Sequence, residues 1–222
     1  IAQPALDPAH PERGGVAPAD MQAEFARQGR YTAGLATTYS PSRLTGTSEH
    51  QELATGFEIG RRFHAAPVRR IADGRGMHLG HTHVADGRWR VYAFGDETGD
   101  GLRAFAQWWT DAAESPARLF APGGASGASG ASRTSDVDGA GADADAVIDV
   151  HGIFLGLQDW EKAWAADPDD DIFTRRGIAR AGAIVIVRPD QYVAHVLPLG
   201  ARAELGEFFR GILMPTLDPA VA

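Results

Sequence analysis

The order of strand-like and helix-like segments after residue 88 limits this chain to few folds. Apolar segments typical of strands and amphipathic segments typical of helices alternate as strand 88–94, helix 102–113, strand 146–153, helix 157–166, strand 183–187, strand 191–197 and helix 201–213. This order is a βαβ unit followed by a ββα unit, which is the connectivity of a thioredoxin fold. We therefore expect an α/β fold, thioredoxin-like, with a mixed sheet flanked by helices.

The part of the chain before residue 88 carries weaker signals. They predict a short helix over 18–28, a β-like segment over 31–39, an irregular connector over 56–68 and a strand over 77–84. Asp86-Gly87 is a strong hairpin signal, so we expect the strand at 77–84 to pair with the one at 88–94.

The length of 222 residues leaves room for one domain and an appendage. We assign 1–45 to an N-terminal extension and 46–222 to the thioredoxin-like domain. Within that domain, 121–145 consists almost entirely of small and polar residues, which predicts a flexible loop because such a segment buries little apolar surface. Trp108, Trp109, Trp160 and Trp164 fall at helical spacing, which indicates packing residues.

Cysteine is absent from the whole sequence. Redox-active thioredoxin folds hold a Cys-X-X-Cys pair between the first strand of the βαβ unit and its helix, where this sequence reads GDETGDG over 95–101. They also hold a proline just before the third strand, where this sequence reads Ala-Arg-Ala-Gly over 179–182. Disulfide exchange and thiol-based peroxide reduction are therefore excluded by the chemistry of the residues.

Charge and hydropathy exclude two further classes of partner. The net charge of −8, from 29 acidic and 21 basic residues, opposes binding to a phosphate backbone, so we expect no nucleic-acid partner. No apolar run reaches the ~18–20 residues that a bilayer-spanning helix needs, so we expect no membrane partner and a cytoplasmic location.

The segment HLGHTH is the main candidate for metal chemistry. His78, His81 and His83 follow one another closely enough for His81 and His83 to share one face of a strand, as zinc ligands would. No third ligand is fixed by the sequence, and exposed histidines at a sheet edge are the commoner arrangement. Asp96 begins a weak calcium-loop pattern whose twelfth position is Gln107, which is not a carboxylate. We assign no catalytic, cofactor-binding or metal-binding residue.

Several segments together resemble one known family. They are GFEIGRRFHAAPV over 56–68, RIAD over 70–73 with Leu79, DGRWRVYAF over 86–94, and IVIVRPDQYVA over 184–194 with Leu197-Pro198. Their order and spacing resemble the C-terminal region of the FAD-dependent aromatic hydroxylases, the group of phenol 2-monooxygenase and 3-hydroxybenzoate 4-monooxygenase. YTAGLATTYSPSRL over 31–44 resembles the end of the flavin and substrate region of the same enzymes.

The resemblance implies an oxidoreductase that uses FAD and NAD(P)H to hydroxylate phenols or hydroxybenzoates in the degradation of aromatic compounds. It also implies that the catalytic flavin domain is not in this chain, that this portion alone is inactive and binds no cofactor, and that it supports a homodimer through a thioredoxin-like domain without the redox pair. The sequence does not decide the phenolic substrate, the choice of NADH or NADPH, or whether the chain is a fragment or a separate subunit.

Two alternatives remain open. The first is a stand-alone protein-interaction module that holds a partner through the apolar stripe of 102–113 or of 205–212. The second is a small metal-binding protein built on His78, His81 and His83.

Overall fold

The structure is a computed structural model that describes residues 15, 17–64, 66–121, 146–155 and 163–213, and it divides into two units, 1–38 and 39–222. In the first unit, helix α1 (Pro18–Thr32) starts with a proline and buries none of its side chains. The predicted helix is therefore confirmed and longer than expected. The β-like prediction for 31–39 is wrong, because Tyr31 and Thr32 complete the last helical turn, where the Thr32 hydroxyl donates to the Gln28 carbonyl.

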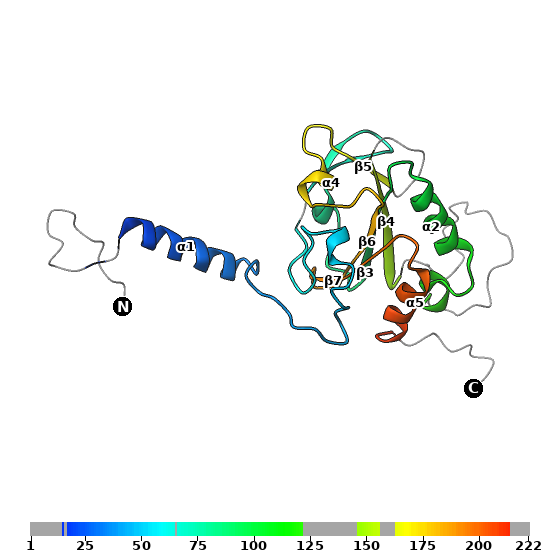
Figure 1. The fold of residues 1–222 in the computed structure, drawn as a ribbon, viewed down its shortest axis with the longest axis horizontal. Helices are drawn as coiled ribbons and strands as arrows, with labels where there is room; N and C mark the ends of the chain where they lie inside the picture. The colour runs from blue at the N-terminus through cyan, green and yellow to red at the C-terminus, as the bar shows by residue number, and fades with distance from the viewer. Residues whose placement is uncertain (1–14, 16, 65, 122–145, 156–162, 214–222) are drawn as a thin grey trace. The chain divides into compact units, whose positions relative to one another are not determined.

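The second unit is built on one mixed sheet of seven strands in the order β2-β1-β5-β4-β3-β6-β7 (Figure 1). The strands are β1 (Pro67–Arg70), β2 (Gly76–His78), β3 (Trp89–Phe94), β4 (Ile148–Phe154), β5 (Ala163–Ala166), β6 (Ala183–Val187) and β7 (Val193–Leu197). β4 is parallel to β3 and to β5, and the other neighbouring pairs are antiparallel.

Four of these strands and two helices reproduce the expected connectivity. β3, helix α2 (Asp100–Asp111) and β4 form the βαβ unit. β6, β7 and helix α5 (Arg202–Arg210) form the ββα unit, and β6 lies antiparallel to β3. The prediction of a thioredoxin-like mixed sheet flanked by helices is confirmed, and β5, β1 and β2 extend the sheet beyond β4.

Helices and loops cover both faces of the sheet, so the side chains of β3 are buried on both sides (Figure 1). On one face, α2, α5 and the short helix α3 (Pro116–Leu119) pack their apolar stripes on the sheet. On the other face, the short helix α4 (Ile172–Arg175), the 3-10 turn η2 (Gln51–Leu53) and the chain up to β1 supply the cover, and Phe63 stacks on Tyr92 at 4.6 Å. Among the described residues, the buried apolar side chains thus form two separate clusters.

The predicted hairpin between 77–84 and 88–94 is wrong. β2 pairs with β1 at one edge of the sheet, and after it the chain forms the 3-10 turn η3 (Leu79–His81). β3 has β4 on one side and β6 on the other, so neither of its edges could accept a further strand. In its described part, the connector predicted over 56–68 forms no helix or strand before β1, and β1 itself was not predicted.

The helix predicted over 157–166 is also wrong in its described part, since residues 163–166 form β5. Backbone pairing with β4 on one side and β1 on the other outweighs the helix propensity of the alanines in this segment. Residues 157–162 of that prediction, Trp160 and residues 122–145 of the predicted loop lie outside the described residues. Trp108, Trp109 and Trp164 are buried packing residues, the last on a strand.

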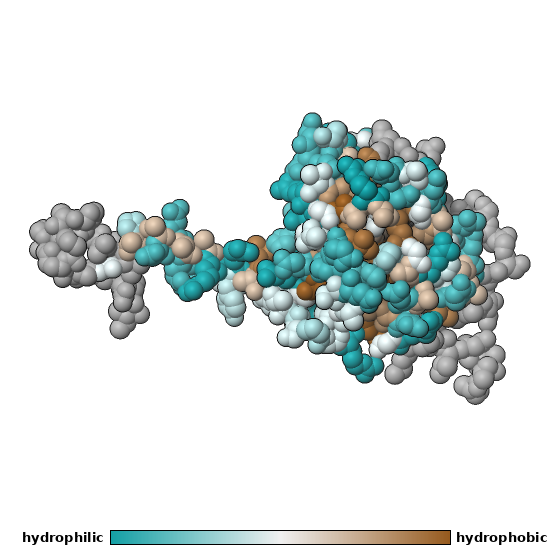
Figure 2. Space-filling view, in the orientation of Figure 1, coloured by the Kyte–Doolittle hydropathy of each residue, from teal (hydrophilic) through white to brown (hydrophobic). Residues whose placement is uncertain are grey.

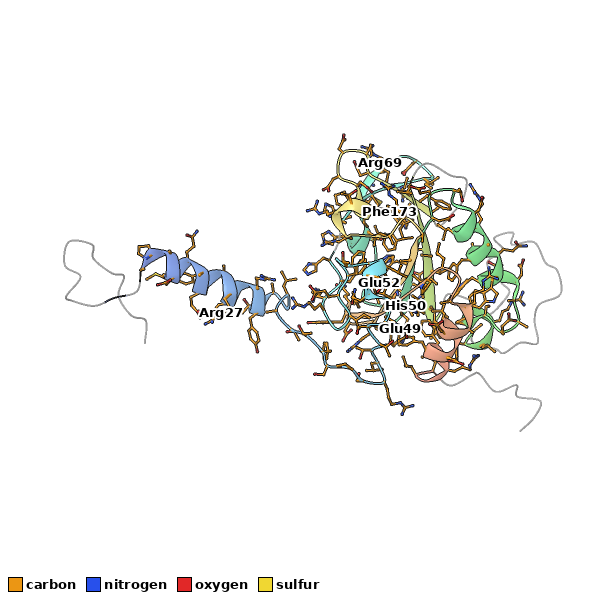
Figure 3. All side chains as sticks on the ribbon, in the orientation of Figure 1. Arg27, Glu49, His50, Glu52, Arg69 and Phe173 are labelled. Carbon is orange, nitrogen blue, oxygen red and sulfur yellow. The ribbon has the colours of Figure 1, made fainter. Side chains whose placement is uncertain are left out.

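His195 of β7 is expected to make the stability of the fold depend on pH. Its ring is buried, and burial lowers its pKa to about 4, with the charge of His50 (Figure 3) acting in the same direction. In the unfolded chain a histidine titrates near pH 6.5, so the unfolded state binds more protons between these two values. The contribution of His195 to the free energy of unfolding is therefore fully present above pH ~6.5 and is lost as the pH decreases toward 4. Allowing for solvent screening, the loss is about 1–2 kcal/mol.

Urea unfolding at pH 7 and pH 5 checks this expectation. We expect His195→Asn to reduce the difference in unfolding free energy between the two pH values. His81→Asn, a substitution at an exposed position, serves as the control and should leave that difference unchanged. An equal pH dependence in the His195 variant and the unmodified chain would show that His195 is not the titrating group.

Candidate functional site

The junction between β3 and α2 is the position at which thioredoxin folds hold their reactive thiols. Here it carries Asp96, whose carboxylate accepts hydrogen bonds from the Thr98 hydroxyl at 2.8 Å and from the backbone N–H of Gly101 at 3.0 Å. Gly99, directly before α2, has a positive φ of 75°. The loop therefore folds back so that Asp96 caps the first turn of the helix.

The hydrogen bonds of this cap also determine the pKa of Asp96. Burial by itself raises the pKa of Asp96, but hydrogen bonds from Thr98 and from backbone N–H groups, including those of Gly101 and Leu102, outweigh it and hold the pKa below its ordinary value. The N-terminus of α2 thus already receives a negative group from its own chain. A cofactor pyrophosphate needs such a helix N-terminus without a competing carboxylate, so the described residues do not fit the phosphates of FAD at this junction.

The three histidines of HLGHTH do not form a common site. The exposed rings of His78 and His81 stack on each other with centroids 5.3 Å apart. His83 instead lies against His151 of β4, with centroids 4.5 Å apart. The alternative of a metal site built on all three histidines is therefore wrong, because the chain turns through η3 between His78 and His83 and directs the last ring elsewhere.

A polar cluster surrounds His83 at one end of β3 and β4. Nε2 of His151 lies 2.9 Å from Oδ2 of Asp149, and the indole N–H of Trp164 donates to Nδ1 of His151 at 3.4 Å. On β3, the guanidinium of Arg90 lies 3.3 Å from the same Asp149 oxygen and 2.8 Å from Asp86. Arg90, Asp149 and His151 are all buried, so the cluster combines ion pairs and an imidazole in a low-dielectric setting.

His83 is neutral at neutral pH in this environment. Burial is the first cause that lowers its pKa to about 4, and the neighbouring His151 and Arg90 lower it further, against an opposing effect of Asp149 and Asp86. A neutral imidazole keeps one nitrogen lone pair for a hydrogen bond or a metal ion.

Asp149 and His151 were not predicted as partners of His83. They occupy positions i and i+2 of an otherwise apolar strand, IDVHGIF over 148–154, so they share one face of β4. Two polar residues at that spacing in a fully buried strand are the signal that could have singled them out. Their distance from His83 along the chain gave no hint of the contact.

The apolar stripes of α2 and α5 are not available to a partner. Leu102, Phe105 and Trp109 of α2, and Leu205 and Phe209 of α5, are buried in the core that these helices form with the sheet. The interaction-module alternative based on these stripes is therefore wrong: the sheet of the same chain already covers them. In the part of the chain that the structure describes, no helix is both long and apolar enough to cross a bilayer.

Curated monooxygenases are similar to this chain over part of their length. It is 40% identical over 232 aligned positions to 3-hydroxybenzoate 4-monooxygenase of Comamonas testosteroni, covering 90% of this chain and 34% of that protein. It is 26% identical to a phenol 2-monooxygenase, fsqG, of Aspergillus fumigatus, covering 86% of this chain and 34% of that protein.

A solved structure of aklavinone-11 hydroxylase with FAD and aklavinone is 18% identical, with a TM-score of 0.43, and the match covers 79% of this chain and 26% of that one. The chain thus spans about a third of the length of the curated relatives it matches. The model of the phenol hydroxylase C-terminal dimerisation domain matches residues 37–217. The chain therefore belongs to the family of phenol hydroxylase C-terminal dimerisation domains.

Proposed function

We propose that this chain is the C-terminal assembly portion of an FAD- and NAD(P)H-dependent enzyme that hydroxylates phenols or hydroxybenzoates in the cytoplasm. In this proposal, residues 46–222 hold two copies of the enzyme together and pack on its flavin and substrate domain. Residues 1–45 form the end of that domain. The observation that carries the proposal is the match of residues 37–217 to a dimerisation-domain family whose relatives are about three times as long.

The described residues support a structural role and not a chemical one. The junction that carries thiols in redox-active thioredoxin folds carries a helix-capping carboxylate, and the same carboxylate competes with a cofactor phosphate. The names of two relatives, 3-hydroxybenzoate 4-monooxygenase and phenol 2-monooxygenase, support hydroxylated aromatic rings as the substrate class. FAD supplies the oxidising chemistry of such an enzyme, and we assign its binding to residues outside this chain.

Helix α1 supports the existence of a further packing partner. None of its 15 residues is buried, and Phe25 and Tyr31 are 67% and 72% exposed. An isolated helix of about this length is marginally stable in water, so most helices of this size are held by packing. Figure 2 shows hydrophobic residues on α1 beside hydrophilic ones. Because α1 lies before the residues that the family model matches, we assign its cover to the flavin and substrate domain.

The proposal predicts that the 222-residue chain self-associates and binds no flavin. Sedimentation equilibrium should give a mass of twice the 23.6 kDa of one chain. After incubation with excess FAD and desalting, the protein should show no flavin absorbance and no phenol-dependent oxidation of NADPH.

Each measurement can contradict one part of the proposal. A strictly monomeric chain at every concentration tested would contradict the assembly role. Retention of one FAD per chain would place the flavin site within these residues and contradict the assignment of cofactor binding to another part of the enzyme.

A further inference from the structure

The cluster of His83, Asp149 and His151 offers three metal-binding side chains within reach of one point. One possible ligand atom from each residue lies within 4.8 Å of the other two. We propose that these three residues bind a divalent transition-metal ion, with zinc as the best fit. This proposal replaces the expectation from the sequence that the chain holds no metal, and it does not depend on the hydroxylase assignment.

The donor set matches the chemistry of zinc. Two imidazole nitrogens and one carboxylate oxygen are the protein ligands of many zinc sites, in which water completes a tetrahedral shell. The chain contains no cysteine, so sites that depend on thiolates are excluded. The nitrogen and oxygen ligands also fit Co²⁺ and Ni²⁺, which serve as spectroscopic probes of the same site.

The backbone fixes two of the ligands and leaves the third adjustable. Asp149 and His151 lie on β4 where it pairs with Arg90 and Tyr92 of β3, and their facing ligand atoms are 2.9 Å apart. His83 is half-buried and is followed by Val84, which is 76% exposed, so its ring can move with the surface segment that carries it. In a tetrahedral zinc site with bonds of about 2.0–2.1 Å, ligand atoms lie about 3.3–3.5 Å apart, so an inward shift of His83 by at most about 1.5 Å suffices.

The hydrogen bonds of His151 define what metal binding must displace. Nε2 of His151 faces the Asp149 carboxylate, and Nδ1 accepts from the Trp164 indole N–H at 3.4 Å. A neutral imidazole that binds a metal ion through Nε2 carries its one proton on Nδ1, where it would face the Trp164 N–H. Zinc binding must therefore break the hydrogen bond from Trp164, which lowers the affinity.

Arg90 sets an upper limit on the affinity. Its guanidinium lies close to Asp149 and repels a second cation there. When Asp149 coordinates the metal ion, Arg90 keeps its ion pair with Asp86, whose carboxylate lies 2.8 Å away. We therefore expect binding weaker than that of structural zinc fingers, which have no cation beside the ligands.

The test is a calorimetric titration of the metal-free 222-residue chain with zinc chloride at pH 7. We expect one zinc per chain. His83→Ala and His151→Asn should each lower the affinity by about tenfold or more. The double variant His78→Ala with His81→Ala is the matched control and should bind zinc as the unmodified chain does.

The outcomes distinguish binding at the proposed site from nonspecific binding by surface histidines. The proposal would be overturned if the double variant at His78 and His81 lost zinc affinity while His83→Ala kept it. The absence of stoichiometric zinc binding to the unmodified chain would also overturn it. His83 is half-buried, so His83→Ala should keep the fold, and circular dichroism verifies this for both single variants. Co²⁺ gives an independent readout: its visible spectrum should show tetrahedral coordination in the unmodified chain and lose it in His83→Ala.

Discussion

Replacing Gly182 with alanine is expected to lower the free energy of unfolding by about 3–5 kcal/mol. Gly182 precedes β6 with a φ of +79°, where an L-residue is strained. A Cβ at this position would lie 2.5 Å from the Phe94 carbonyl oxygen and 3.0 Å from the Asp96 nitrogen. These atoms belong to the backbone of β3 and of the α2 cap, so they cannot move aside without disturbing both.

Urea denaturation of Gly182→Ala measures this effect, and Gly74→Ala is the matched control. Gly74 has a φ of +69°, and a Cβ there would meet no atom within 4 Å, so only the backbone strain applies. We expect the control to cost about 1–2 kcal/mol. Equal losses in the two variants would show that the close approach of β3 to Gly182 adds nothing to the strain.

The second large effect is expected from Arg90→Met, which removes the cation of the buried cluster. Arg90 is 6% exposed and lies between Asp86 and Asp149. Methionine fills much of the same space, but the buried carboxylate of Asp149 then lacks the cation that faces it. Breaking a buried ion pair from one side typically costs about 3–5 kcal/mol, and we expect a loss of stability in that range.

Two further variants test the cause of that loss. Arg88→Met removes a guanidinium 3.5 Å from Asp86 whose side chain is 33% exposed, and it should cost less than about 1 kcal/mol. Adding Asp149→Asn to Arg90→Met should restore part of the stability, because the buried carboxylate that has lost the Arg90 cation is then neutral. A double variant no more stable than Arg90→Met would indicate that Arg90 acts through packing and not through its charge. Thermal unfolding followed by circular dichroism compares all of these variants.

Local patterns were reliable where one segment carries its own signal. The run AIVIV over 183–187 and the amphipathic spacing of Leu102, Phe105 and Trp109 predicted β6 and α2 without reference to the rest of the chain. They failed where the state of a segment depends on a distant partner. Residues 163–166 are rich in alanine and carry a helix-like signal, but β1 and β4 provide hydrogen-bonding partners on both sides and make them a strand.

The candidate cluster shows the same division. His83 was singled out from HLGHTH, but its partners in that segment were the wrong ones, because η3 separates its ring from those of His78 and His81. Asp149 and His151 come within reach only because β4 lies beside β3 in the sheet. No periodicity within either segment encodes that approach.

The sequence by itself determined which chemistry is impossible and which connectivity the core adopts. The absence of cysteine removes thiol redox chemistry, and the order of apolar segments after residue 88 defines the βαβ and ββα units. Only the tertiary structure decided the outer strands, the cap formed by Asp96 and the meeting of His83 with β4. The physical reason is that side-chain periodicity records which face of an element is buried, whereas strand pairing and ion pairs depend on segments that are far apart along the chain.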